Sequence, residues 1–186
     1  MTVDEIFTAL GKHMVEGLMV HTQMSDYFNF LSLKGYHKCH EYHFFEESRN
    51  FRKLSGYYLK HYNKLIIDSH PSNPGLIPED WFKYKRSDVD GATRKAGIQT
   101  GFSKWVKWEQ DTKTFYEQMH KELMNINEVA AAAELKKYIR DVDEELAKAN
   151  QKLLELTASN FNISDIIMEQ DILYEKYKKK MCEIFK

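Results

Sequence analysis

The three prolines of this 186-residue chain fall close together, at Pro71, Pro74 and Pro78. Proline removes a backbone hydrogen-bond donor and clashes with the preceding turn, so the interior of an α-helix excludes it. The chain also has only eight glycines, the other residue that weakens helices. The sequence therefore allows long helices on both sides of a single break.

Apolar residues recur at steps of three and four through most of the chain, which is the period of an amphipathic helix. In the first segment the repeating positions are Ile6, Leu10, His13, Gly17, His21, Met24, Phe28 and Leu31. We expect helices at about residues 4–31, 36–67, 91–124, 128–157 and 164–181. Lys34-Gly35 is the expected first stop, and Asn127 and Ser164 are the expected N-caps of the last two helices.

The expected links between these helices differ in length. Short turns join the first helix to the second and the third to the fourth. Residues 68–90 form a long connection that opens with the turn-rich sequence Asp68-Ser-His-Pro-Ser-Asn-Pro-Gly75. Two antiparallel hairpins joined by a long crossover make a four-helix bundle. We therefore predict an all-α, antiparallel four-helix bundle with a short fifth helix, formed by residues 1–186 as a single domain.

Charge and composition argue against several classes of protein. The 27 basic and 28 acidic residues nearly cancel, so no global field attracts nucleic acid or a membrane surface. No apolar run approaches the roughly 20 residues that cross a bilayer, and the N-terminal sequence lacks the layout of a signal peptide. Two cysteines, Cys39 and Cys182, are too few for a disulfide framework. We expect a cytoplasmic protein with free thiols that binds neither membranes nor nucleic acid.

Four polar residues stand in or beside the apolar stripes, one on each long helix: His13, Glu47, Glu109 and Glu145. A buried carboxylate is costly unless it is paired or binds a metal ion. Three carboxylates and an imidazole that converge in a bundle core can hold a pair of iron or manganese ions. Two alternatives stay open: His13 as a hydrogen-bonded core histidine, and Glu109 and Glu145, at the edges of their stripes, as carboxylates that reach solvent.

A second group of candidate ligands lies at the start of the second helix. His37, His40 and His43 follow one another at steps of three, next to Cys39 and Glu41. Imidazoles three or four residues apart on a helix can share a zinc or copper ion. The same pattern also fits a partly exposed, aromatic helix end that binds no metal.

Several of these residues stand in short motifs that resemble those of the ferritin-like superfamily. Glu109 followed by His120-Lys121 is similar to that family's site glutamate and its Leu-His-Lys sequence. Asp143-Glu144-Glu145-Leu146 resembles the ferritin Asn-Glu-Gln-Val stretch, and Glu46-Glu47 resembles the glutamate of its Glu-x-x-His motif. The spacing from His13 to Glu47 is close to that between the first two site residues of the family. The expected helix order also looks like ferritin.

The resemblance implies a ferritin-like fold and an iron or manganese site made of His13, Glu47, Glu109 and Glu145. It also implies Fe(II) oxidation by oxygen or iron storage, and a homo-oligomer. Two positions depart from the pattern. Asn50, or Arg49 if Glu46 is the site residue, replaces the histidine of Glu-x-x-His, and His13 replaces the glutamate of the first helix.

These departures motivate an alternative hypothesis, a non-catalytic protein with the ferritin fold that has lost the metal site. Such a protein acts by self-association or by binding a partner. Aromatic residues are common in protein interfaces, and the chain offers Tyr57, Tyr58, Tyr62 and Trp81.

The Dps branch of the superfamily gives a second comparison. Leu33-Lys34-Gly35 followed by Cys39-His40-Glu41 resembles its Val-Lys-Gly and Leu-His-Glu stretches. The resemblance implies an iron site between subunits and protection of DNA. However, Phe30 stands where that branch has its leading histidine, and the near-neutral charge argues against DNA binding.

Overall fold

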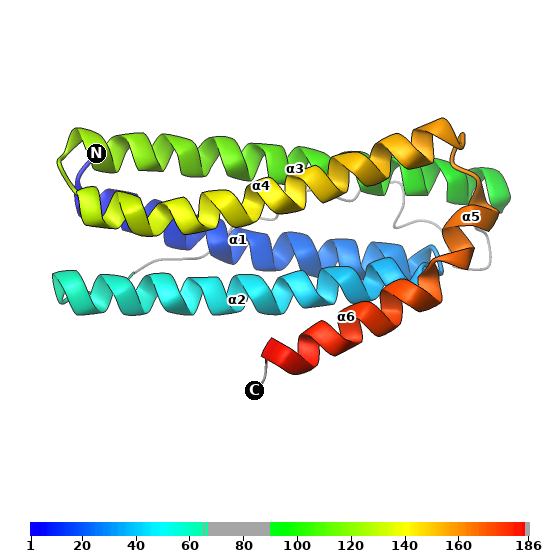
Figure 1. Ribbon diagram of the computed structural model, residues 1–186, viewed down its shortest axis with the longest axis horizontal. Helices are drawn as coiled ribbons and strands as arrows, with labels where there is room; N and C mark the ends of the chain where they lie inside the picture. Colours follow the sequence, from blue (N-terminus) through cyan, green and yellow to red (C-terminus); the bar gives the residue numbers. More distant parts are fainter. Residues whose placement is uncertain (65, 67–89, 185–186) are drawn as a thin grey trace.

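The computed structural model describes residues 1–64, 66 and 90–184, and within them it contains six helices and no strand. The helices are α1 (Val3–Phe30), α2 (Lys34–Tyr62), α3 (Gly91–Asn125), α4 (Val129–Ala158), α5 (Ile163–Met168) and α6 (Gln170–Ile184). The four long helices run side by side, and α3 begins at the opposite end of the bundle from the end of α2 (Figure 1). The predicted bundle of two hairpins is confirmed. The turn-rich sequence and Trp81 lie outside the described residues.

The first two helices begin and end through local capping. Thr2 and Glu5 form a capping box at the start of α1, in which the side chain of each accepts a hydrogen bond from the backbone of the other. α1 ends at Phe30, and Ser32 takes the left-handed conformation with φ of 65°. The prediction of a stop at Lys34-Gly35 is therefore wrong, because Ser32 makes the turn and both residues belong to α2.

Three other predicted boundaries also move. α2 ends at Tyr62, before the predicted residue 67, because Asn63 takes the left-handed conformation that ends a helix. Asn127 is likewise left-handed and precedes the N-cap Glu128, so it does not cap α4. The last helix begins one residue earlier than expected, since Asn162 is the N-cap and accepts a hydrogen bond from the backbone of Ser164.

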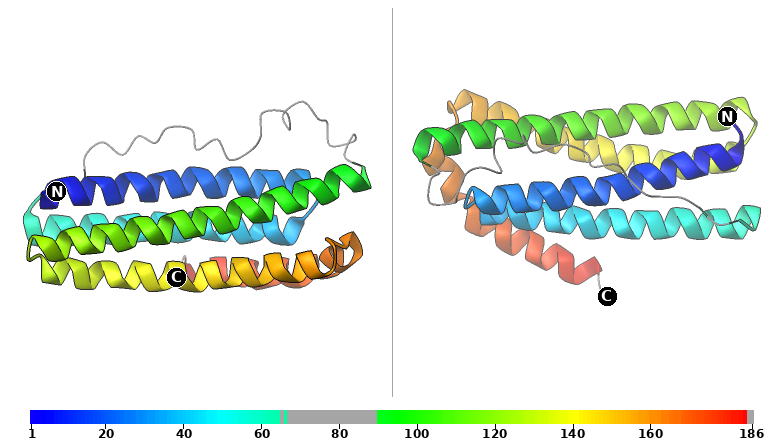
Figure 2. Two further views of the ribbon diagram at one scale, coloured as in Figure 1. Left: turned by 90° about the horizontal axis from the view of Figure 1, so that it is seen from above. Right: turned by 180° about the vertical axis from the view of Figure 1, so that it is seen from behind.

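The predicted fifth helix is divided at Glu169 into α5 and α6. α6 then runs back along α2, as Figures 1 and 2 show. α6 caps the N-terminus of α2. The N-cap residue of α2 is Leu33, whose side chain makes no capping hydrogen bond. Oε1 of Gln170 accepts hydrogen bonds from the backbone nitrogens of Gly35 (2.9 Å) and Tyr36 (3.4 Å). These two hydrogen bonds hold the start of α6 against the start of α2.

The apolar core consists of two clusters along the bundle axis. One contains Ile6, Phe7, Leu10, Met14, Leu54, Tyr58, Tyr116, Leu123, Leu135 and Val142, among others. The other contains Val20, Met24, Phe28, Tyr36, Phe102, Trp105, Ala149 and Tyr177, among others. The residues that separate the clusters along each helix include Gly17, Glu47, Glu109 and Glu145. A polar layer therefore crosses the middle of the bundle.

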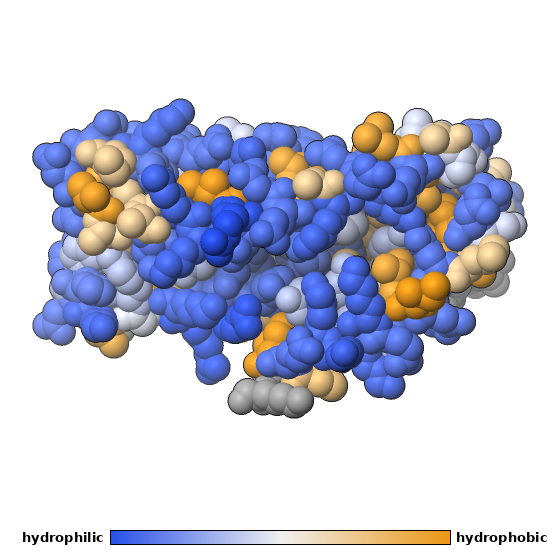
Figure 3. Space-filling model, in the orientation of Figure 1, coloured by the Kyte–Doolittle hydropathy of each residue, from blue (hydrophilic) through white to orange (hydrophobic). Residues whose placement is uncertain are grey.

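The polarity of the surface and the state of the two cysteines can be compared with what the composition predicts. The face drawn in Figure 3 is mostly hydrophilic, with apolar side chains in separate patches at both ends and along its middle. No helix in the described part of the chain is long and apolar enough to cross a membrane. Cys39 is buried, Cys182 is exposed, and both are free thiols, as predicted.

Candidate metal centre

A cavity of about 310 Å³ occupies the polar layer between the two apolar clusters. Three of the four predicted site residues line it: Glu47 from α2, Glu109 from α3 and Glu145 from α4. His21, His43 and Glu46 also line it, and the basic residues Arg49, Lys148 and Lys180 take part as well. The structure thus brings carboxylates from three helices to one place.

Glu109 is the most deeply buried of the three carboxylates, with 5% of the residue exposed. Its Oε1 accepts a hydrogen bond from the indole Nε1 of Trp105 at 3.0 Å. Burial raises the pKa of Glu109 to about 7; the charge of His43 opposes this shift and that of Glu145 adds to it. The possibility that Glu109 reaches solvent is therefore excluded.

Glu47 has an oxygen without a partner. The residue as a whole is only partly buried, but its Oε2 is shielded from solvent and has no hydrogen-bond partner among the described residues. Burial, together with the nearby charges of Glu109 and Glu46, raises the pKa of Glu47 to about 8. At neutral pH this carboxyl group therefore holds a proton or requires a cation.

The positive charges beside these carboxylates include those of Lys148 and His43. Nζ of Lys148 donates to Oε1 of Glu145 at 2.6 Å, and Nε2 of His43 lies 3.3 Å from Oε2 of the same glutamate. Nδ1 of His43 lies 3.3 Å from Oε2 of Glu46. Burial disfavours the charged imidazole, but Cys39 and Glu145 outweigh it and raise the pKa of His43 well above its usual value. Nη2 of Arg49 also lies 3.9 Å from Oε1 of Glu46, so Glu46 and Glu145 have nearby cations.

His13 lies apart from this group. Its Nε2 is 3.0 Å from Oγ1 of Thr112, and its ring stacks on Trp108 and Phe115 with centroids 5.0 and 4.4 Å away. Burial lowers the pKa of His13 to about 4, which keeps the imidazole neutral at neutral pH. This geometry is that of a hydrogen-bonded core histidine, which was the alternative to a metal ligand at this position.

The site prediction omitted two histidines that line the cavity, His21 and His43. On α1, Gly17 faces Glu47, since an added Cβ would lie 3.5 Å from Cγ of Glu47. One turn later along the same stripe, His21 reaches the cavity. His43 precedes Glu47 by four residues and so shares its helix face. The helical periodicity of the sequence therefore already placed His21 and His43 on inner faces of their helices.

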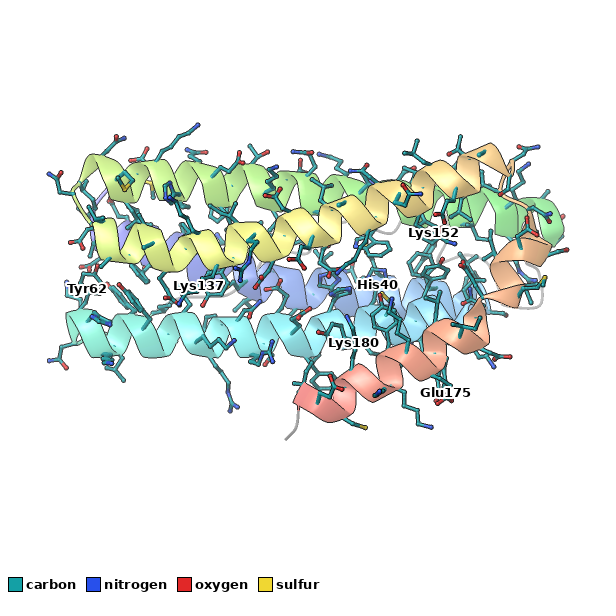
Figure 4. The ribbon with its side chains drawn as sticks, in the orientation of Figure 1. His40, Tyr62, Lys137, Lys152, Glu175 and Lys180 are labelled. Carbon is teal, nitrogen blue, oxygen red and sulfur yellow. The ribbon has the colours of Figure 1, made fainter. Side chains whose placement is uncertain are left out.

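The three histidines at the start of α2 do not converge as a group. Nδ1 of His37 lies 2.8 Å from Oγ of Ser25 and 3.1 Å from the Ser25 carbonyl oxygen, on the α1 side. His40 and His43 are buried, and Figure 4 shows His40 pointing from α2 into the bundle. Their nearest imidazole neighbour is His21.

Within residues 1–64, 66 and 90–184, no group of three or more His, Cys, Asp and Glu side chains is arranged so that it could hold a metal ion. The three carboxylates of the cavity therefore have suitable chemistry for a cation, but they are not yet turned toward a common point. The orphaned oxygen of Glu47 is the observation that favours a cation in this place.

No protein-family model and no curated protein matches this sequence. Solved structures do match its fold. A humanized archaeal ferritin aligns with a TM-score of 0.72 at 14% identity over 92% of this chain and 94% of its own. An engineered closed form of the ferritin from Archaeoglobus fulgidus aligns with a TM-score of 0.71 at 15% identity over 94% and 96% of the two chains. The open pore ferritin of the same hyperthermophilic archaeon gives 0.72 at 14% identity over 92% and 94%. The chain has a divergent, ferritin-like fold.

Proposed function

We propose that this protein binds iron, or a similar ion such as manganese, in the cavity lined by Glu47, Glu109 and Glu145. The observation that carries the proposal is the buried, unpaired Oε2 of Glu47 beside two further carboxylates from other helices. Buried polar groups in native proteins normally have a partner. A divalent cation supplies one and also replaces the protons that raised pKa values keep on Glu47 and Glu109.

The ligand chemistry suits this class of ion. Carboxylate oxygens bind Mn²⁺ and Fe²⁺, and a neighbouring imidazole favours the iron-like ions over magnesium and calcium. Binding requires the carboxylates to turn toward a common point, which the volume of the cavity permits. His43 and Lys148 balance the carboxylate charge until a metal ion replaces them. The ferritin-like fold supports Fe(II) as the ion, with oxidation by oxygen or storage as the activity.

We expect the purified protein to bind Fe(II) without oxygen and the double variant Glu47→Gln/Glu109→Gln to bind at least about tenfold more weakly. Elemental analysis by inductively coupled plasma mass spectrometry gives the stoichiometry, and oxygen consumption then reports any Fe(II) oxidation. His13→Phe is the matched control and should keep the iron content, because His13 faces Thr112 and not the cavity. Iron content that is equal in the wild type and the double variant would contradict the proposal.

Self-association is a second candidate function, favoured by large apolar side chains that stay exposed. Met168, Ile172, Leu154 and Ile167 are 78%, 72%, 65% and 51% exposed. They come from the end of α4, from α5 and from the start of α6, and Figure 3 shows apolar side chains at this end of the bundle. Clustered exposed apolar surface is typical of interaction sites.

We therefore propose a homo-oligomer in which this end of the bundle contacts a second copy. Light scattering coupled to gel filtration should give a mass above that of one chain, and Met168→Asp/Ile172→Asp should lower it. Leu59 is 47% exposed and lies near the C-terminal end of α2, at the other end of the bundle. Leu59→Asp is therefore the control that should leave the mass unchanged. A wild-type monomer would contradict this candidate without affecting the proposed iron site.

A further inference from the structure

Three buried imidazole rings meet beside the carboxylate cavity: His21 from α1, and His40 and His43 from α2. Their exposed fractions are 2%, 0% and 4%. The ring centroids are 5.4 Å apart for His21 and His40, 5.3 Å for His21 and His43, and 6.0 Å for His40 and His43. The rings form a nearly equilateral triangle that is closed off from solvent.

The size of this triangle matches three imidazoles around one tetrahedral ion. Zinc binds imidazole nitrogen at about 2.0–2.1 Å in tetrahedral geometry, which places the ring centroids of two ligands about 5 Å apart. The same geometry separates two ligand nitrogens by about 3.3 Å. In this structure the Nδ1 atoms of His21 and His40 lie 3.2 Å apart.

A hydrogen-bonded pair of core histidines explains only part of this arrangement. One proton shared between His21 and His40 satisfies their two Nδ1 atoms. It leaves Nε2 of His40 buried and without a partner among the described residues. Both nitrogens of His43 instead lie 3.3 Å from carboxylates, Nδ1 from Glu46 and Nε2 from Glu145. Burial lowers the pKa values of His21 and His40 well below the usual value, so both are in the neutral form that binds metals.

We propose that His21, His40 and His43 together bind one ion of a transition metal that prefers nitrogen ligands, with Zn²⁺ as the probe. The nitrogens do not yet converge, because His43 faces Glu145 and Glu46. Binding requires the His43 ring to turn about its Cβ–Cγ bond toward the other two rings and to release to solvent the proton that Glu46 and Glu145 favour on it. The site lies beside the carboxylates of the proposed iron site and uses none of them.

The proposal differs in one residue from the zinc or copper site expected from sequence. In that site His37 is the third imidazole, but Ser25 holds the His37 ring away from His40 and His43. In the site proposed here, His21 replaces His37 as the third imidazole. Variants of His21 and His37 therefore separate the two possibilities.

The test is zinc binding by equilibrium dialysis, together with the visible absorption of the Co²⁺ form, which reports tetrahedral coordination. We expect the wild type to bind zinc, and His21→Gln and His40→Phe to bind it at least about tenfold more weakly. His37→Gln, the matched control, should bind like the wild type. The phenyl ring of His40→Phe keeps the packing of His40 on Phe28 and Trp105, whose centroids lie 5.2 and 4.9 Å away. Circular dichroism confirms that each variant is folded.

Two results would overturn the proposal: a wild type that binds no zinc, or His21→Gln and His40→Phe variants that bind zinc as the wild type does. Repeating the titration in Glu47→Gln/Glu109→Gln separates this site from the proposed iron site. Zinc retained by that double variant, in the absence of iron binding by the wild type, would contradict the iron proposal and support the histidine site.

Discussion

We expect Glu47→Gln to stabilise the metal-free protein at pH 8 and to flatten the dependence of its stability on pH. In the folded protein the pKa of Glu47 is about 8, against an ordinary value of 4.5. The folded state therefore holds a proton between these pH values that the unfolded chain has released. By linkage, the free energy of unfolding is highest below pH 4.5 and falls as the pH rises to about 8.

The two pKa values set an upper limit of about 5 kcal/mol for this loss. Because the Glu47 residue is only partly buried, we expect a gain of about 2–3 kcal/mol at pH 8 on replacing it with the neutral glutamine. Urea unfolding in the presence of a chelator, followed by circular dichroism from pH 5 to pH 8, measures it. Glu175→Gln, whose side chain is 70% exposed, is the control that should change nothing. Destabilisation of the Glu47→Gln protein at pH 8 would contradict a raised pKa of Glu47 in the folded protein.

We expect Gly35→Ala to destabilise the fold by about 1–3 kcal/mol, the usual cost of forcing extra atoms into a packed core. A Cβ at Gly35 would lie 2.7 Å from the carbonyl oxygen of Gln170 and 2.7 Å from Cβ of Leu173. Neither atom can move unless α6 does. The substitution should therefore separate α6 from α2 and weaken the hydrogen bond from the Gly35 nitrogen to Gln170.

Gly56→Ala is the matched control, since Gly56 lies in the same helix and nothing stands within 4 Å of an added Cβ. Alanine suits a helix interior better than glycine, so this variant should gain about 0.5–1 kcal/mol. Thermal unfolding of the two variants measures both effects. Equal stability of Gly35→Ala and Gly56→Ala would show that α6 does not pack on α2 as described.

The helical architecture followed from the sequence because three- and four-residue periodicity and the placement of proline are local properties. The helix boundaries that were predicted wrongly depend on the conformation or packing of single residues. Nothing in the pattern around Lys34-Gly35 indicates that Ser32 makes the turn, or that Gly35 serves instead for the close approach of α6. The break at Glu169 depends on the same packing, which the sequence does not encode in one place.

The candidate site was predictable in part for a similar reason. A helical wheel gives the face on which a side chain lies but not its neighbours on other helices. It therefore put Glu47 on an inner face of its helix, where the residue lines the cavity, and could not choose between His13 and His21, which share one stripe of α1. Glu109 appeared to lie at the edge of its stripe, yet the tertiary packing buries it and Trp105 hydrogen-bonds it.

The proposed iron site is tested most directly by a crystal structure of the protein loaded with Fe(II) without oxygen, or with Mn²⁺, using anomalous scattering to locate the ion. We expect an anomalous peak inside the cavity, with carboxylate oxygens of Glu47, Glu109 and Glu145 turned toward it at bonding distance. Loaded crystals with no peak in the cavity, or with peaks only at surface carboxylates, would contradict the account.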